Sequence, residues 1–95
     1  MDGTEARTIL KSHLAGLRAK SYGELVALIA VHGTTEVKGP SGVTYQVELQ
    51  AFWDDPKKPH QIVRIMGSID DGGLRAYFPM SDSFLMAPDG AFVDE

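Results

Sequence analysis

The sequence predicts an α+β fold in which two N-terminal helices pack on one face of an antiparallel sheet of four to six strands, arranged as a meander. Apolar residues before Gly33 recur every three or four positions, which is the period of an amphipathic helix. After Gly33 they alternate with polar residues, as in a half-exposed strand. Turn residues separate the alternating runs at short intervals, which favours locally connected strands. The 95 residues show no repeat and no linker, so we expect one domain over residues 1–95.

Two helices are predicted, at about residues 4–19 and 22–32. The first carries a stripe of apolar residues at helical spacing. The second opens with the pattern of a capping box, in which Ser21 is the N-cap and Glu24 the third helical residue. Gly33 is predicted to end this helix as a C-cap. Because the join between the helices is very short, we expect them to meet at a sharp angle or as a hairpin.

Six strands are predicted, and the longest gives the clearest signal. Over residues 43–53, apolar side chains alternate with mostly polar ones, so one face of the strand is apolar. The segments between strands contain glycine, proline or aspartate, and Asp71-Gly72 is suited to a tight hairpin turn. The sheet face without helices is expected to be partly open to water. The predicted strands are residues 35–38, 43–53, 61–69, 74–78, 84–86 and 91–93.

The composition argues against several classes of function. The net charge of −4 disfavours nucleic-acid binding, which needs a basic surface to neutralise phosphates. The lack of cysteine removes disulfides, thiolate metal sites and cysteine nucleophiles. The longest apolar run, Leu25–Val31, is far shorter than the roughly 20 residues that cross a bilayer, and the N-terminus does not resemble a signal peptide. We therefore expect a cytoplasmic protein with no nucleic-acid or membrane partner.

The residues most suited to catalysis or metal binding have simpler explanations. Asp54-Asp55 and Asp70-Asp71 offer carboxylates for a hard cation, but both pairs lie at predicted turns, where aspartate is favoured for backbone reasons. The three histidines lack the spacing of a helical zinc site. Of the three histidines, only His60, next to a polar loop, is an acid–base candidate. We expect no catalytic residue, no metal ligand and no cofactor.

The polar face of the predicted sheet is the most informative surface. Arg64, Arg75 and Tyr77 alternate outward from apolar neighbours, and arginine and tyrosine are frequent in binding hot spots. Phe52 lies on the same face at the end of its strand, where it forms a small apolar spot with the prolines that follow. The alternative is a solvated face joined by cross-strand ion pairs. The binding candidates are Glu48, Phe52, His60, Arg64, Arg75 and Tyr77.

These observations predict a small non-enzymatic module for protein interaction or regulation that uses the open sheet face. Its partner is expected to be another protein or a second copy of the chain, because small antiparallel sheets leave edges available for pairing. The alternative is a small enzyme or ligand-binding protein. In that case His60, Glu48 and Tyr77 supply acid–base groups, and Arg64 or Arg75 holds an anionic small molecule. A pocket lined by these groups would distinguish the two hypotheses.

Several segments resemble those of a group of small uncharacterised bacterial proteins. The resemblance covers most of the chain from residue 21 onward. It implies a bacterial, soluble, single-domain protein, and it implies no activity, cofactor or partner. The segments are Ser21-Tyr22-Gly23-Glu24-Leu25, Gly39-Pro40-Ser41-Gly42, Tyr45-Gln46-Val47-Glu48, Phe52-Trp53-Asp54-Asp55, Gly67-Ser68-Ile69-Asp70-Asp71-Gly72-Gly73 and Ser81-Asp82-Ser83-Phe84.

Overall fold

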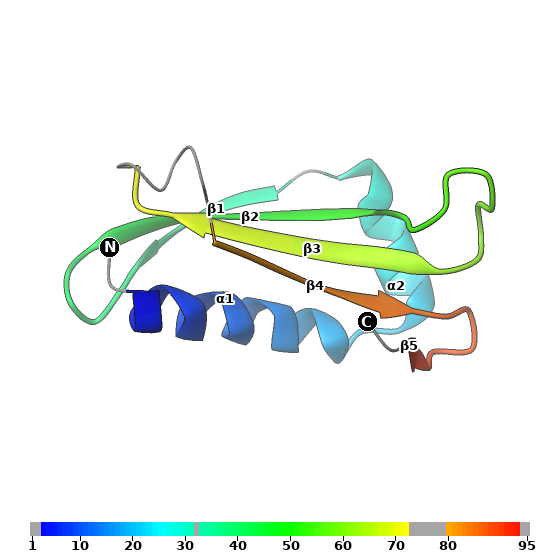
Figure 1. Ribbon diagram of the computed structural model, residues 1–95, viewed down its shortest axis with the longest axis horizontal. Helices are drawn as coiled ribbons and strands as arrows, with labels where there is room; N and C mark the ends of the chain where they lie inside the picture. Colours follow the sequence, from blue (N-terminus) through cyan, green and yellow to red (C-terminus); the bar gives the residue numbers. More distant parts are fainter. Residues whose placement is uncertain (1–2, 32, 73–79, 94–95) are drawn as a thin grey trace.

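Helices and strands form two layers, with the helices on one face of a five-stranded antiparallel sheet (Figure 1). The computed structural model describes residues 3–31, 33–72 and 80–93. The strands lie in the sheet in chain order, so the predicted α+β meander is confirmed. The elements are α1 (Gly3–Arg18), α2 (Tyr22–Ala27), the 3₁₀ helix η1 (Leu28–Ala30), β1 (Gly33–Lys38), β2 (Thr44–Trp53), β3 (Val63–Asp70), β4 (Met80–Met86) and β5 (Phe92–Val93).

Helix α1 lies along the sheet because one stripe of its surface is apolar. Its four buried residues follow one another at spacings of four, four and three, which keeps them on one face. They belong to the same core cluster as the inward side chains of β2, β3 and β4. Burying one such leucine contributes about 1.5–3 kcal/mol, so this stripe holds the helix on the sheet. The four residues are Ala6, Leu10, Leu14 and Leu17.

The second helix begins as predicted but ends earlier. Ser21 Oγ accepts a hydrogen bond from the Glu24 N–H at 3.2 Å, and the Glu24 carboxylate accepts one from the Ser21 N–H at 3.1 Å. After Ala27 the chain tightens into η1, and Val31 is extended, with φ −118° and ψ 121°. Gly33 therefore begins β1, and the prediction that it caps a helix over 22–32 is wrong. A β-branched residue such as Val31 favours extended backbone, which outweighs the helical spacing before it.

The alternation predicted for the longest strand is confirmed. In β2, Tyr45, Val47 and Ala51 are buried toward the helices, while Gln46 and Glu48 are exposed on the other side. A slip of one residue would place the apolar side chains in water, so the burial of one face fixes the register of the strand. β2 lies inside the sheet, paired with both β1 and β3.

The fourth strand is longer than the sequence indicates. The sequence predicts a strand over residues 84–86 and a connection through the polar residues before them. In the structure, β4 already begins at Met80. Its pairing with β3 runs from Ile69↔Met80 to Val63↔Met86, and these ladder bonds hold a segment whose side chains give no alternation. The predicted strand 74–78 lies outside the described residues. At the end of β3, Gly72 has φ +82° and donates its N–H to the Asp70 carboxylate at 2.9 Å, as expected of a turn.

A polar cluster joins the first turn of α1 to the turn between β1 and β2. The carboxylate of Glu5 accepts hydrogen bonds from the Ser41 N–H at 3.0 Å, the Ser41 hydroxyl at 2.7 Å and the Tyr45 hydroxyl at 2.8 Å. Tyr45 is fully buried, so its hydroxyl needs such a partner. The cluster fixes this turn relative to the helix.

Candidate functional site

The sheet face that points away from the helices is the candidate site, and we call it the outer face. The alternation of each strand and the pairing registers assign its side chains. Most of them are exposed or half-buried, in contrast to the buried side chains that face the helices. The outer face consists of Thr34, Glu36, Lys38, Thr44, Gln46, Glu48, Gln50, Phe52, Arg64, Met66, Ser68, Asp70, Ser81, Ser83, Leu85 and Val93.

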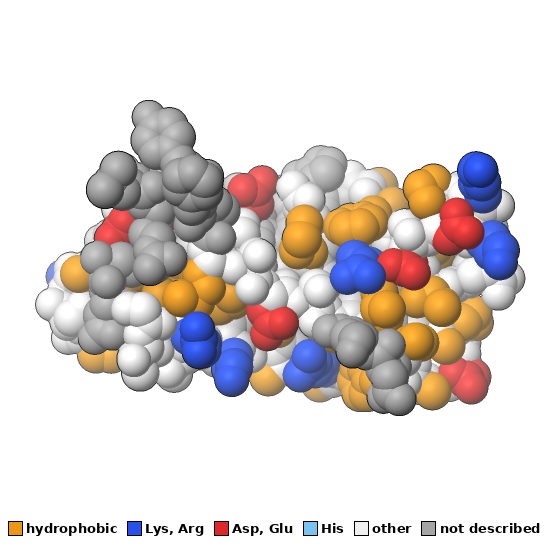
Figure 2. Space-filling model, in the orientation of Figure 1, with side chains coloured by type: hydrophobic (Ala, Val, Ile, Leu, Met, Phe, Trp, Pro, Cys, Tyr) orange, Lys and Arg blue, Asp and Glu red, His pale blue; other side chains and the backbone are white. Residues whose placement is uncertain are grey.

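One line of paired residues crosses four strands at one end of the outer face. Phe52 of β2 pairs with Arg64 of β3, Arg64 pairs with Leu85 of β4, and Leu85 pairs with Val93 of β5. We call these four residues the cross-strand row. Three of the four are apolar, and none of the three belongs to the core cluster under the helices. Figure 2 shows apolar side chains gathered around adjoining blue and red side chains at the end of the molecule that carries the β2–β3 loop.

Arg64 is held in one orientation within this row. Its Nε and Nη2 donate to Oδ1 of Asp54 at 3.1 and 2.9 Å, and its Nη1 donates to the Ser83 hydroxyl at 3.1 Å. The side chains of Arg64 and Asp54 are 32% and 33% exposed, so solvent screens this ion pair and its contribution to stability is small. Its main effect, together with the Ser83 bond, is to fix the guanidinium between Asp54 and Ser83 while leaving it in contact with solvent.

The structure brings together some of the predicted site residues and separates others. Phe52 and Arg64 are direct neighbours across two strands. Glu48 lies on the same face, but it pairs with Ser68, four residues along β3 from Arg64. At about 3.3 Å per residue that separation is about 13 Å, so Arg64 takes Asp54 as its ion-pair partner instead of Glu48. Arg75 and Tyr77 lie outside the described residues.

His60 does not face the cross-strand row. Its backbone has φ +64°, and its ring lies 5.1 Å from that of Trp53, tilted by 58°. Trp53 follows Phe52 in the strand and therefore points to the opposite face, where it packs against the core. The acid–base and anion-binding groups of the alternative hypothesis, His60, Glu48 and Arg64, thus do not converge on one point. The part of the chain that the structure describes also contains no cluster of three or more possible metal ligands.

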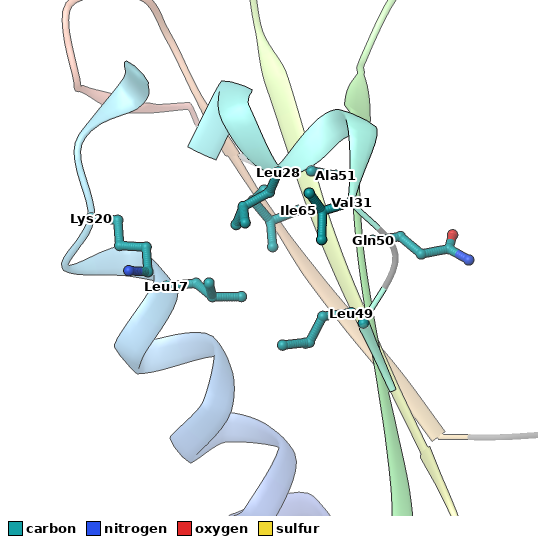
Figure 3. A pocket seen from close by; sticks show the side chains of 9 residues that line it. Leu17, Lys20, Leu28, Val31, Leu49, Gln50, Ala51 and Ile65 are labelled. Carbon is teal, nitrogen blue, oxygen red and sulfur yellow. The ribbon is translucent and has the colours of Figure 1, made fainter. Parts of the chain in front are cut away.

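An apolar pocket lies on the opposite side of the sheet, between the end of α1, η1 and β2 (Figure 3). Leu17, Leu28, Val31 and Leu49 point toward one another there, whereas Gln50 turns away. Its volume is about 150 Å³, well below the roughly 300–1,000 Å³ of typical ligand pockets. Its accessible lining is almost wholly apolar, so it offers little polar surface to orient a ligand. It has the character of a packing gap.

Sequence reasoning missed Leu85 and Val93 of the cross-strand row, and also Asp54 and Ser83, which hold Arg64. Asp54 and Leu85 each left a signal in the sequence. Asp54 follows Phe52 by two residues and so continues the outward alternation beyond the end of β2. Leu85 lies in the unbroken apolar run Phe84–Met86, which is the pattern of a strand that is covered on both faces. Only 7% of Leu85 is exposed, although it points away from the helices.

Comparison of the chain with protein-family models, with characterised proteins and with solved structures finds no match in any of the three. The resemblance to small bacterial proteins therefore stays a prediction. None of the helices in the described ranges is both long and apolar enough to span a membrane. The functional argument consequently rests on the geometry of the outer face.

Proposed function

We propose that the protein is a small non-enzymatic binding module that recognises another protein through the cross-strand row. The observation that carries the proposal is the position of Arg64 in the cross-strand row, on a face that the helices leave uncovered. Its partly exposed guanidinium is fixed by Asp54 and Ser83, and its strand neighbours are the half-buried Phe52 and the buried Leu85. Apolar anchors around an arginine are typical of the centre of a protein interface. The partner that fits is a protein segment with an apolar side chain next to an acceptor oxygen, either a carboxylate or a backbone carbonyl.

The fixed position of Arg64 supports binding. A free arginine side chain loses rotamer entropy when a partner immobilises it, on the order of 1 kcal/mol. Asp54 and Ser83 already hold this guanidinium, so much of that loss occurs when the protein folds. Their three bonds use one N–H of each nitrogen, and a guanidinium carries five N–H groups. The remaining donors can reach an acceptor on the partner.

Variants of the row test the proposal. The tagged protein is used to isolate candidate partners, and each candidate is then purified and titrated directly by calorimetry. Phe52→Ser and Arg64→Ala are each expected to weaken such a complex by at least about tenfold, because truncation of a central anchor typically costs more than 1 kcal/mol. Circular dichroism and thermal melts confirm that the variants remain folded.

The matched control is Phe92→Ser. Phe92 is 55% exposed, so its substitution also removes exposed aromatic surface. Phe92 lies on the helix side of the sheet, where it packs edge-on against Phe84. This variant is expected to bind like the unmodified protein. A partner whose affinity is lowered by Phe92→Ser, and unaffected by Phe52→Ser and Arg64→Ala, would place binding on the other face and overturn the proposal.

A further inference from the structure

We propose that two copies of the chain pair through β1, in antiparallel orientation about a twofold axis at Val37. This surface is the edge of the sheet and is separate from the cross-strand row. In the sheet order, β1 is an outermost strand. Among the described residues no strand lies beyond β1, five of its six residues are exposed and Val37 is half-buried, so this edge can accept a further strand. An open edge of this kind is a template for pairing with another chain.

The hydrogen bonds of the β1–β2 hairpin show which backbone groups are free. Gly39 donates its N–H to Val43 O at 2.8 Å, so the odd-numbered residues of β1 direct their N–H and C=O groups toward β2. The hydrogen bond from Asp54 N–H to Ile62 O leads to the same assignment. It shows that the even-numbered residues of β2 direct their backbone groups toward β3, so the odd-numbered residues of β2 bond to β1. The backbone groups of Thr34, Glu36 and Lys38 therefore point outward.

The charges on the edge select one register. With Val37 opposite its own copy, Glu36 of each chain faces Lys38 of the other, which gives two cross-strand ion pairs and four backbone hydrogen bonds. Moving the axis by one residue, to Glu36, would set the two Glu36 side chains opposite each other. Within β1–β2, Glu36 and Lys38 face the neutral residues Gln46 and Thr44, and among the described residues neither forms an ion pair. Their charges are therefore available to a second copy.

The edge is also held in place before it pairs. Glu5 binds the backbone and hydroxyl of Ser41 in the turn that follows β1, which ties this end of the hairpin to α1. A preformed strand loses less conformational entropy on pairing than a flexible one. Because a twofold axis perpendicular to the sheet keeps each face on its own side, the dimer has a continuous ten-stranded sheet with both outer faces on one side. A partner that carries two binding segments could then engage both cross-strand rows at once.

Sedimentation velocity of the full chain at low ionic strength tests the pairing. Because so short an edge buries little surface, we expect a weak dimer with a dissociation constant above about 10 µM. The sedimentation coefficient should then rise with protein concentration between roughly 10 and 500 µM. Glu36→Lys places lysines opposite each other twice and is expected to raise the dissociation constant at least fivefold. The exchanged variant, Glu36→Lys with Lys38→Glu, restores both pairs and is expected to return it to within about threefold of the original.

Two proline variants give the matched control. Proline at position 34 or 36 removes a backbone N–H that points away from β2, so the edge strand tolerates the substitution. Glu36→Pro removes two intermolecular hydrogen bonds and is expected to abolish dimerisation, whereas Thr34→Pro lies outside the paired residues and is expected to preserve it. A chain that stays monomeric at 500 µM, a dimer unaffected by Glu36→Lys, or failure of the exchanged variant to recover would overturn the proposal. Each of these results leaves the test of the cross-strand row unchanged, because that test uses different residues.

Discussion

Gly39 and Gly67 are required by close packing, and they differ in what surrounds them. A Cβ at Gly39 would lie 2.4 Å from Oε1 and 2.8 Å from Cδ of Glu5. That carboxylate is anchored by its bonds to Ser41 and Tyr45, so it cannot move without losing them. A Cβ at Gly67 would lie 2.9, 3.1 and 3.4 Å from the terminal methyl groups of Leu10, Leu49 and Leu14, which are the far ends of flexible side chains. The first site is rigid, and the second can adjust.

The two alanine substitutions are therefore expected to differ in stability. Gly39→Ala should lower the free energy of unfolding by about 2–3 kcal/mol, because it combines overpacking with the loss of the hydrogen bonds of Glu5, of which the one from the Tyr45 hydroxyl is partly buried. Gly67→Ala should cost less than about 1 kcal/mol, since the leucines can rotate and alanine suits a strand better than glycine does. Urea denaturation measures both values. Equal losses would show that the Glu5 cluster is free to rearrange.

The apolar pocket predicts a stabilising substitution. Ala51 lies in its lining, and Ala51→Val adds two methyl groups to a space of about 150 Å³ on a strand, where valine is favoured. We expect a gain of about 0.5–1 kcal/mol, which raises Tm by roughly 2–6 °C in a domain of this size. Ala51→Thr has the same shape but brings a hydroxyl to an apolar lining, so it should give no gain. If both variants lowered Tm equally, the pocket would be closed in solution.

At the level of elements, α2 depends on its first turn because it is only six residues long. A helix of this length is marginal by itself and needs its cap and its packing. Hydrogen bonds from the Ser21 backbone and side chain lower the pKa of Glu24 below the usual 4.5, with a smaller contribution from nearby Lys20. A folded-state pKa below the unfolded one means that ionised Glu24 stabilises the native state.

The sign of this shift gives a pH dependence. The stabilisation by Glu24 is complete above the unfolded pKa near 4.5, and it disappears as the pH falls through the lower folded value. Glu24→Gln keeps the capping geometry without the charge. Its Tm should therefore lie below that of the unmodified protein at pH 7, and the difference should narrow at pH values below 4.5. A difference in Tm that stayed constant between pH 7 and 3 would contradict this assignment.

At the scale of the whole molecule, the two sides of the sheet differ in burial. The side under the helices is buried and holds the fold together. The outer face and the β1 edge are the surfaces for which we propose contacts with other chains. The molecule measures 40 × 23 × 22 Å, and the cross-strand row lies toward one end of the sheet, near the loop between β2 and β3.

Hydrogen exchange should reveal this arrangement along the free edge. In a dilute sample the amide of Val37, bonded to β2, should exchange slowly, while those of Glu36 and Lys38 should exchange at least about tenfold faster. At concentrations that favour the dimer, the amides of Glu36 and Lys38 should become protected and that of Thr34 should not. Residue-resolved exchange by NMR measures these rates. Fast exchange at Val37 in the dilute sample would contradict the assigned pairing of β1 with β2.

The sequence by itself determined the elements whose side chains are sorted by a repeating environment. The stripe of α1 and the alternation of β2 are visible in the chain because each buried face recurs at a fixed spacing. The capping box of α2 was equally predictable, since its contacts lie within three residues. Phe52 and Arg64 were placed on one face for the same reason.

Tertiary structure alone decided the features that depend on contacts between distant residues. The start of β4 at Met80 is set by pairing with β3, because its own side chains carry no alternation. The anchoring of Arg64 by Asp54 and Ser83, and of the hairpin turn by Glu5, required three-dimensional proximity across 10, 19 and 36 residues. Such contacts have no period along the chain. They exist only once the register of the sheet has brought the strands together.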